Sequence, residues 1–343
     1  MIIPLKMTKF RLWMEKDVSF IIPAYNASAT IGGTLNSILA LGIEPSRYEV
    51  IVIDDCSSDD TVQVAESFRH SIPDLVIRKQ PVNGRQGAAR NRGVTLAEGR
   101  YAFFVDSDDF LFNGFMDALD MACRNDADIC FFPVFCESEG IYWTFGSDRI
   151  VMDGKTFCES CFDPGCPLFL SPWSGIYKTA FLREVNYPFV EGHQAEDSDF
   201  VLRHISSAGR VCYCPSPSYH YTDAPGSTIH KRTISIVIDY LLMAERLKKI
   251  SVSTSAGLPV FSRGIQEKVM PIIVYRLGLW YLGKLDIRDT LSLYEEFPLE
   301  RRRSICTSGV RSFPACVLKH KYISIACIAL YGRLSALSRA LGR

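Results

Sequence analysis

The sequence lacks the features of a membrane-spanning or secreted protein. Its C-terminal apolar run, Tyr322–Tyr331, is ten residues long, whereas a helix that crosses a bilayer needs about twenty. Lys6, Lys9 and Arg11 interrupt the apolar residues near the start, so we expect no signal peptide there. The 12 cysteines in 343 residues are too few for a dense disulfide framework, and no internal repeat is present. These absences indicate a reduced, cytosolic setting.

Glycine is missing where two classes of nucleotide-binding enzyme require it. The apolar strand expected at residues 18–22 continues into PAYNASAT, which contains no glycine. Nucleotidyltransferases that make sugar nucleotides, and NAD-dependent oxidoreductases, bind phosphate through a glycine-rich loop after their first strand. The sequence therefore argues against both classes. The cysteines of CESCFDPGC (Cys158, Cys161 and Cys166) lack the two regular ligand pairs of a structural zinc site, so we interpret them as small buried thiols.

The net charge is zero, but the charges are unevenly distributed. Residues 1–230 contain 19 Lys and Arg against 30 Asp and Glu, whereas residues 231–343 contain 19 against 8. From Arg301 onward there are nine basic residues and no acidic one. Such a tail indicates an anionic partner, either a membrane surface or nucleic acid. The acidic first half argues against a nucleic-acid-binding protein.

Residues 18–132 alternate between apolar strands and helices. We expect strands at 18–22, 49–53, 75–79, 101–105 and 128–132, with helices after residue 30 and at about 61–69, 87–97 and 115–123. Continuous apolar strands separated by helices predict a parallel sheet that is covered on both faces. Residues 133–230 are irregular and rich in Pro, Gly and aromatic residues, which is typical of loops that shape a pocket. After about residue 235 the pattern is helical.

Carboxylates gather at the ends of two expected strands. Asp106, Asp108 and Asp109 follow the strand 101–105, and Asp54 and Asp55 follow the strand 49–53. Ligands in such sheets bind at the carboxyl ends of the strands. Three neighbouring carboxylates fit a solvated turn that caps the next helix, and they also fit a site for a divalent cation. Taken alone, this cluster leaves both interpretations open.

Four motifs follow one another in the order of a known enzyme family: VSFIIPAYN, VIDDCSSDDT, GAARNRGVTLAEGRYAFFVDSDD and AEDSDFVLR. Together they resemble the family 2 glycosyltransferases over roughly residues 17–230. The resemblance implies an α/β fold of the GT-A nucleotide-sugar-binding type, in which helices flank a mostly parallel central sheet. We expect an N-terminal extension at 1–16, the GT-A domain at 17–230 and a helical, basic C-terminal region at 231–343.

On this resemblance, the nucleotide lies at the first two strand ends. Pro23 and Tyr25 form the wall of the nucleoside pocket, where a tyrosine ring can stack on a base; an ordinary loop aromatic is the alternative. Asp55 matches the position that accepts the imide N–H of uracil. Asp54 is expected to orient its own loop through backbone amides.

Arg90 stands in the family's ARN position, near the start of a helix. A guanidinium there suits a diphosphate, because both the side chain and the helix N-terminus attract anions. An ion pair with a strand-end aspartate is an equally good interpretation. Cys56 and Arg85 stand where the family commonly has glycine, so the geometry of these two loops is in question.

Asp106-Ser107-Asp108 corresponds to the family's metal motif and implies Mn²⁺ or Mg²⁺ as cofactor. Asp108 is the expected direct ligand, and Asp106 is expected to contact ribose, the metal or a metal-bound water. Asp109 is expected to cap the next helix.

Glu196 and Asp197 match the catalytic-base motif. We assign the base to Asp197 and a substrate contact to Glu196; the alternative is that both merely open a helix. Trp173 fits an acceptor-side wall or core packing. His220 fits packing better than ligation.

The resemblance implies an inverting, metal-dependent transfer of sugar from a nucleotide-diphosphate sugar to a hydroxyl. We expect a UDP-sugar donor, a saccharide or lipid-linked acceptor and a role in cell-surface polysaccharide synthesis. The alternative is a catalytically degenerate homologue that acts as a binding or assembly subunit. Such a homologue should have lost a carboxylate, yet Asp55, Asp106, Asp108 and Asp197 are all present.

The basic tail predicts docking on the inner face of the cell membrane. Read as a helix, its apolar residues recur at steps of four and three, which places them on one face: Ile323, Cys327, Leu330, Leu334, Leu337 and Leu341. An apolar stripe with basic neighbours suits anionic headgroups. A C-terminal helix that packs on the catalytic domain is the alternative.

Overall fold

The structure is a computed structural model of the chain. It describes residues 16–144, 151–154, 156–157, 171–193, 196–222, 239, 242–243 and 245–246. The expected N-terminal extension up to residue 15, Cys158, Cys161 and Cys166, and the basic tail with its apolar stripe lie outside the described residues.

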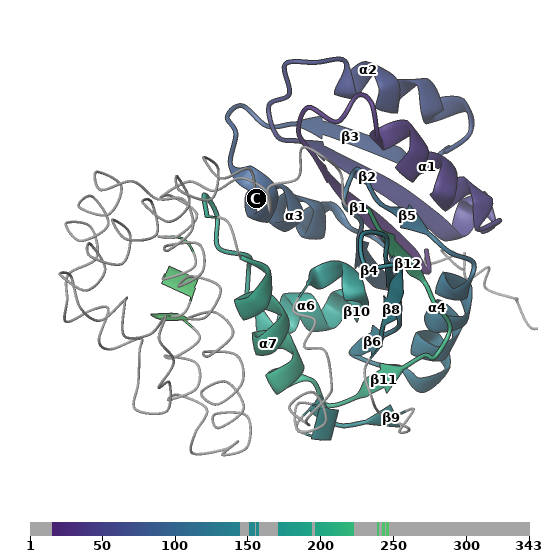
Figure 1. Cartoon of the computed structure of the whole chain (residues 1–343), viewed down its shortest axis with the longest axis vertical. Coiled ribbons are helices and arrows are strands. Elements are labelled where there is room, and N and C mark those ends of the chain that lie inside the picture. The colour runs from purple at the N-terminus through teal and green to yellow at the C-terminus, as the bar shows by residue number, and fades with distance from the viewer. Residues whose placement is uncertain are drawn as a thin grey trace, which may run out of the picture.

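A large mixed sheet forms the centre of the molecule (Figure 1). Its strand order is β3-β2-β1-β4-β10-β6-β11-β9. The strands are β1 (Val18–Ala24), β2 (Tyr48–Asp54), β3 (Leu75–Lys79), β4 (Tyr101–Phe104), β6 (Ile129–Phe131), β9 (Val151–Met152), β10 (Gly175–Lys178) and β11 (Val211–Tyr213).

The first half of this sheet is parallel, as the alternating sequence predicts. β1 pairs in parallel with β2 on one side and with β4 on the other, and β3 continues the sheet beyond β2. The second half of the sheet, from β10 to β9, is not uniformly parallel, although the alternating sequence predicts a parallel sheet. β10 inserts between β4 and β6 and runs antiparallel to both. The sequence of β10 lies in the irregular region, where a four-residue strand leaves no clear alternation to recognise.

Helices cover both faces of the sheet (Figure 1). Phe115 of α4 contacts Phe20 of β1 on one face, where Ile31 of α1 also enters the core. Phe200 of α7 contacts Phe104 of β4 on the opposite face. The helices are α1 (Ile31–Ala40), α2 (Thr61–Glu66), α3 (Arg85–Leu96), α4 (Gly114–Asn125), α6 (Thr179–Val185) and α7 (Asp197–Ser207), and the short 3₁₀ turns are η1 (Pro45–Arg47), η2 (Ser67–His70) and η3 (Pro172–Ser174).

α3 lies unusually close to the sheet because small residues form its inner face. Gly87, Ala88, Ala89 and Gly93 are buried there. A Cβ atom at Gly93 would overlap the side chain of Ile21 in β1. The start of α3 lies beside the loops after β2 and β4, because Gly84 N donates to Asp55 Oδ1 and Arg90 Nη2 donates to Asp106 Oδ1.

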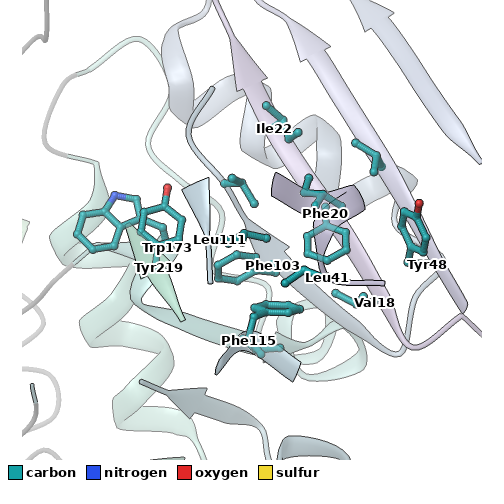
Figure 2. Packing of buried hydrophobic residues seen from close by; sticks show 14 of the residues in the cluster. Val18, Phe20, Ile22, Leu41, Tyr48, Phe103, Leu111, Phe115, Trp173 and Tyr219 are labelled. Atoms are coloured by element: carbon teal, nitrogen blue, oxygen red, sulfur yellow. The ribbon is translucent and has the colours of Figure 1, made fainter. Parts of the chain in front are cut away.

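Aromatic rings from the sheet and from α4 contact one another in the core, where Figure 2 shows Phe20, Phe103 and Phe115 among aliphatic side chains. The ring of Phe103 lies 4.8 Å from that of Phe115 and 6.0 Å from that of Tyr219, measured between centroids. Phe20, Phe103 and Phe115 are all completely buried. Each contributes roughly 1.5–3 kcal/mol of hydrophobic stabilisation, which fixes β1 and β4 relative to α4.

A second, smaller sheet lies next to the loop that carries Asp106, Asp108 and Asp109. Its order is β5-β12-β7-β8, with β12 antiparallel to β5 and parallel to β7. Its strands are β5 (Phe110–Leu111), β7 (Val134–Cys136), β8 (Ile141–Trp143) and β12 (Tyr219–Tyr221). β5 begins directly after Asp109, so this sheet supports the loop that carries the acidic cluster.

None of the helices in the described part of the chain is long and apolar enough to cross a membrane.

Candidate active site

The parallel register brings the expected site residues to one edge of the sheet. Ala24 at the end of β1 pairs with Asp54 at the end of β2, and β4 ends beside β1 just before Asp106. The loops after these three strands therefore lie at the same edge, and the N-terminal half of α3 faces them.

Asp54 and Asp55 are both buried but contact different groups. Asp54 Oδ2 accepts the backbone N–H of Ser57 at 3.1 Å, which fits the loop-orienting role that the sequence predicts. Asp55 Oδ1 accepts hydrogen bonds from Gln80 Nε2 at 2.7 Å and from the backbone N–H of Gly84 at 2.8 Å. No described residue donates to Asp55 Oδ2. One carboxylate oxygen thus fixes the loop before α3, and the other is available to accept from a ligand.

Pro23 and Tyr25 flank the end of β1 in different environments. Pro23 is a buried member of the strand, whereas Tyr25 is 54% exposed. The following loop is fixed to the loop after β2, because Asn26 N donates to Ser57 Oγ at 2.9 Å. An exposed ring on a fixed loop fits the base-stacking interpretation of Tyr25.

Cys56 and Arg85 keep the backbone conformation that glycine would provide. Cys56 has φ +68° and Arg85 has φ +64°, both in the left-handed region that side chains disfavour. The loops that the sequence left in question therefore adopt a glycine-type geometry despite the substitutions.

Arg90 links the acidic cluster to the expected base. Its Nη2 donates to Asp106 Oδ1 at 2.8 Å, and its Nη1 donates to Glu196 Oε1 at 2.7 Å and to Asp197 Oδ1 at 2.8 Å. The side chain is 0% exposed. Of the two roles that the sequence leaves open, the structure contains the ion pair, and it extends to three carboxylates.

The electrostatics of this network are strongly coupled. Burial lowers the pKa of Arg90, but the charges of Asp197, Asp106 and Glu196 outweigh burial and raise it, so the guanidinium stays charged. Burial raises the pKa of Asp197, the neighbouring Glu196 raises it further, and Arg90 partly opposes both. A carboxylate with a raised pKa is a stronger proton acceptor, which suits a general base.

Glu196 and Asp197 also stand at the start of α7, as the alternative interpretation predicts. Glu196 occupies the N-cap position, and Asp197 is the first helical residue. Glu196 is buried, whereas the Asp197 side chain remains 27% exposed. Opening a helix and facing the site are therefore compatible, and Asp197 is the carboxylate of the two that solvent or substrate can reach.

Asp108 and Asp109 differ in their partners. Burial and the nearby Asp106 raise the pKa of Asp108 to about 6, and no cation among the described residues pairs with it. Asp109 is completely buried, and it accepts from Tyr219 Oη at 2.6 Å and from Thr222 N at 2.7 Å. The expectation that Asp109 caps the next helix is wrong, because Asn113 holds the N-cap position of α4.

The donor set at Asp106 and Asp108 fits a hard divalent cation in part. Two aspartates supply carboxylate oxygens, and Asp108 lacks a compensating charge. Within the described residues, no group of three His, Cys, Asp or Glu side chains is arranged to hold a metal ion. The described side chains alone therefore form no complete metal site, and Asp106 and Asp108 are the two carboxylates at this position that a hard cation accepts as ligands.

Trp173 and His220 pack among aromatic rings. Trp173 is 5% exposed and stacks on Tyr219 with a centroid distance of 5.1 Å, so its burial favours the core-packing interpretation. His220 of β12 stacks on Phe112 at 5.6 Å and lies 3.6 Å from Glu137, which directly follows β7, and these contacts agree with packing rather than ligation.

Sequence reasoning missed several residues that contact the site. Tyr219 Oη accepts from the backbone N–H of Asp106 at 3.1 Å, which fixes the start of the acidic loop. Asp239 accepts from Arg85 Nη1 at 3.0 Å and lies 2.7 Å from His193 Nδ1. More than one hundred positions separate Tyr219 from Asp106, and Asp239 from Arg85, so no local pattern could have linked them.

Comparisons with known proteins agree with this geometry. Residues 19–183 match the family model described as "Glycosyl transferase family 2". The chain is 28% identical over 215 residues to the poly(ribitol-phosphate) beta-N-acetylglucosaminyltransferase TarS of Staphylococcus aureus, covering 59% of this chain and 35% of that protein. It is 23% identical to the glycosyltransferase GlyG of Streptococcus pneumoniae, covering 85% of this chain and 95% of GlyG. The chain thus spans about a third of TarS.

Solved structures share the fold. The S. aureus TarS fragment 1–349 matches with a TM-score of 0.63, and its complex with UDP-GlcNAc matches with 0.59; each is 21% identical and covers 95% of this chain and 92% of that one. The mannosyltransferase PcManGT of Pyrobaculum calidifontis, in complex with GDP-Man and Mn²⁺, matches with a TM-score of 0.51 at 14% identity, covering 91% of this chain and 86% of that one. Residues 19–183 thus form a glycosyl transferase family 2 domain, and the fold is of the GT-A type.

Proposed function

We propose that this chain is an inverting, metal-dependent glycosyltransferase with its catalytic domain at residues 17–230. It transfers a sugar from a nucleotide-diphosphate sugar, most simply a UDP-sugar, to a hydroxyl of a saccharide or lipid-linked acceptor. The setting is cell-surface polysaccharide synthesis. The relatives support this proposal, since TarS is named as a polymer N-acetylglucosaminyltransferase and its fragment was solved with UDP-GlcNAc.

One observation supports the proposal most strongly. Arg90 connects Asp106, at the end of β4, to Asp197, at the start of α7, through two hydrogen bonds of 2.8 Å each. One planar guanidinium thereby fixes the distance between Asp106, on the side of the nucleotide sugar, and Asp197, the proposed base. Single displacement at an anomeric carbon needs this arrangement, with a leaving nucleotide on one side and a base on the other.

The chain's own residues have separate roles in the proposed reaction. Tyr25 stacks on the base, and Asp55 Oδ2 accepts the imide N–H of uracil. Asp197 accepts the proton of the attacking hydroxyl as the new glycosidic bond forms and the nucleotide diphosphate departs. Arg90 holds Asp197 and Asp106 in position. Glu196 shares a guanidinium nitrogen with Asp197, so we assign it to the support of the base.

Asp106 and Asp108 would hold Mn²⁺ or Mg²⁺, which neutralises charge on the departing diphosphate when bound. The Mn²⁺ complex of the structurally similar mannosyltransferase supports this assignment. Chelation should abolish transfer, and Mn²⁺ or Mg²⁺ should restore it. Asp108→Ala should remain folded, lose nearly all activity and lose the rise in Tm that Mn²⁺ with UDP gives the unaltered protein. Full activity of that variant in excess chelator would refute the metal site.

A catalytically degenerate binding or assembly subunit is the rival function. The described contacts favour the enzyme, because Asp55, Asp106, Asp108 and Asp197 remain at one edge of the sheet. A screen of nucleotide release from UDP-, GDP- and dTDP-sugars separates the two. Turnover with one donor class supports the enzyme, and binding of UDP without any turnover supports the subunit.

We further propose that the tail docks on an anionic membrane surface. The argument is the apolar stripe from Ile323 to Leu341 with basic flanks and no acid, where each cation near the headgroups adds roughly 1 kcal/mol. The full chain should pellet with anionic vesicles at low salt and detach as salt rises, whereas a chain ending near Arg311 should not pellet. Equal behaviour of both would contradict the docking.

A further inference from the structure

The first turn of α7 is held from two sides. Asp197 and Asp199 are two positions apart, about 200° around a helix, so their side chains leave it in nearly opposite directions. Asp197 contacts Arg90 of α3. Asp199 is completely buried and contacts Arg203 of its own helix at 2.7 Å and Arg246 at 3.1 Å. Arg246 comes from the region that follows the family-like domain.

The loop before α7 is held by the same region. Asp239 is 8% exposed and contacts His193 at 2.7 Å, four residues before Asp197. Asp239 also contacts Arg85, the first residue of α3, at 3.0 Å. The backbone N–H of Gly192 donates to the Gly84 carbonyl at 3.2 Å, and Gly84 in turn donates to Asp55. Asp239 therefore joins His193, four positions before Asp197, to the start of α3, next to the loop that fixes Asp55.

Asp239 and Arg246 lie at helical positions of the C-terminal region. Residues 239, 242, 243, 245 and 246 are each helical. As whole residues, Met243 is 2% exposed and Asp239 is 6% exposed, whereas the Arg246 side chain is 22% exposed. The two residues thus contact His193, four positions before Asp197, and Asp199, two positions after it.

We propose that Asp239 and Arg246 are positioning residues for the catalytic base, so that the C-terminal region completes the active site; this rests on the proposed function. Neither residue touches the reacting atoms. Each acts through a neighbour of Asp197, His193 in one case and Asp199 in the other. Family 2 chemistry in this chain therefore requires residues beyond the family-like domain.

The test measures nucleotide release from the best UDP-sugar by the full chain, for Asp239→Ala, Arg246→Gln and Arg246→Lys. Because a small displacement of a base is costly, kcat should fall about 10- to 100-fold for Arg246→Gln, with the donor KM unchanged. Arg246→Lys should recover part of kcat. Arg100→Gln, which removes the Arg100–Asp126 ion pair at the opposite edge of the sheet, is the matched control and should keep full activity.

The decisive comparison repeats Asp239→Ala and Arg246→Gln in a protein that already carries Asp197→Asn. If Asp239 and Arg246 act through the base, they should cause no further loss there. A loss as large as in the unaltered protein, or a rise in donor KM with kcat intact for Arg246→Gln, would overturn the positioning role while leaving the glycosyltransferase function standing. Absence of turnover in the unaltered protein would overturn the function and the positioning role together.

Discussion

Cys56 shows how a single residue keeps a family geometry at an energetic cost. Its φ of +68° costs a side-chain-bearing residue about 1–2 kcal/mol, and glycine avoids this cost. We expect Cys56→Gly to raise the free energy of unfolding by about 1 kcal/mol, after allowing for the extra freedom of glycine in the unfolded chain. Denaturant unfolding of both proteins measures this change in the free energy of unfolding. As a control, Ala29→Gly at an exposed position with an ordinary φ should lower the stability of the protein. A loss of stability for Cys56→Gly would contradict the account.

Arg90 is the residue on which the site's charge balance depends. Arg90→Met would leave Asp106, Glu196 and Asp197 without their shared cation. Breaking a buried ion pair from one side costs about 3–5 kcal/mol, so we expect a loss of that size in the free energy of unfolding. Arg100→Met removes a partly exposed pair and should cost about 1 kcal/mol or less. Equal losses for the two variants would show that the Arg90 network does not stabilise the fold.

At the residue scale, the sequence was informative where chemistry and position coincide. Asp54, Asp55, Asp106 and Asp108 could be placed at strand ends, because parallel strands end at the same edge. The partner of each carboxylate could not be derived. Arg90 had two reasonable ligands, a diphosphate or a carboxylate, and only the packing of α3 against the sheet decides which groups lie within its reach.

α7 contains a histidine that makes the element sensitive to pH. His204 is 1% exposed among the rings of Phe181, Tyr187 and Phe200, and its Nδ1 lies 2.8 Å from the Phe200 carbonyl. Burial lowers the pKa of His204 from 6.5 to about 4. Below pH 6.5 the unfolded chain binds a proton that the folded chain rejects, so stability is complete above pH 6.5 and falls as the pH drops towards 4.

The loss should reach about 3 kcal/mol at pH 4. His204→Phe keeps an aromatic ring in place and removes the titrating group, so its free energy of unfolding should depend less on pH between 4 and 6.5. Denaturant unfolding of both proteins at several pH values measures the difference. Identical pH slopes for the two proteins would contradict a neutral buried His204.

At the element scale, the success of the sequence-based prediction of each helix or strand depended on its length and on its hydrophobic periodicity. β3 and α4 have boundaries close to those expected, since apolar runs and amphipathic turns mark them. β10, by contrast, has four residues and joins the sheet between two strands that come earlier in the chain. Tertiary hydrogen bonding, and no local preference, determines its position.

At the scale of the whole molecule, the candidate active site combines segments from nearly the full described length. Asp55 and Asp106 come after β2 and β4, Arg90 lies within α3 and Asp197 begins α7. Asp239 and Arg246 add contacts from the C-terminal region. The family resemblance could predict the first group because its motifs keep their order. It could not predict the second group, because ion pairs over such separations leave no trace in a single sequence.

The most direct test of the central claim is the turnover number for nucleotide release, compared between the unaltered chain and Asp197→Asn. The substitution keeps the shape of the side chain and removes the proton acceptor. The account predicts a fall in kcat of about 10²–10⁴, with the donor KM nearly unchanged. An Asp197→Asn chain that turns over its donor at the original kcat would show that Asp197 is not the base and that the proposed mechanism is wrong.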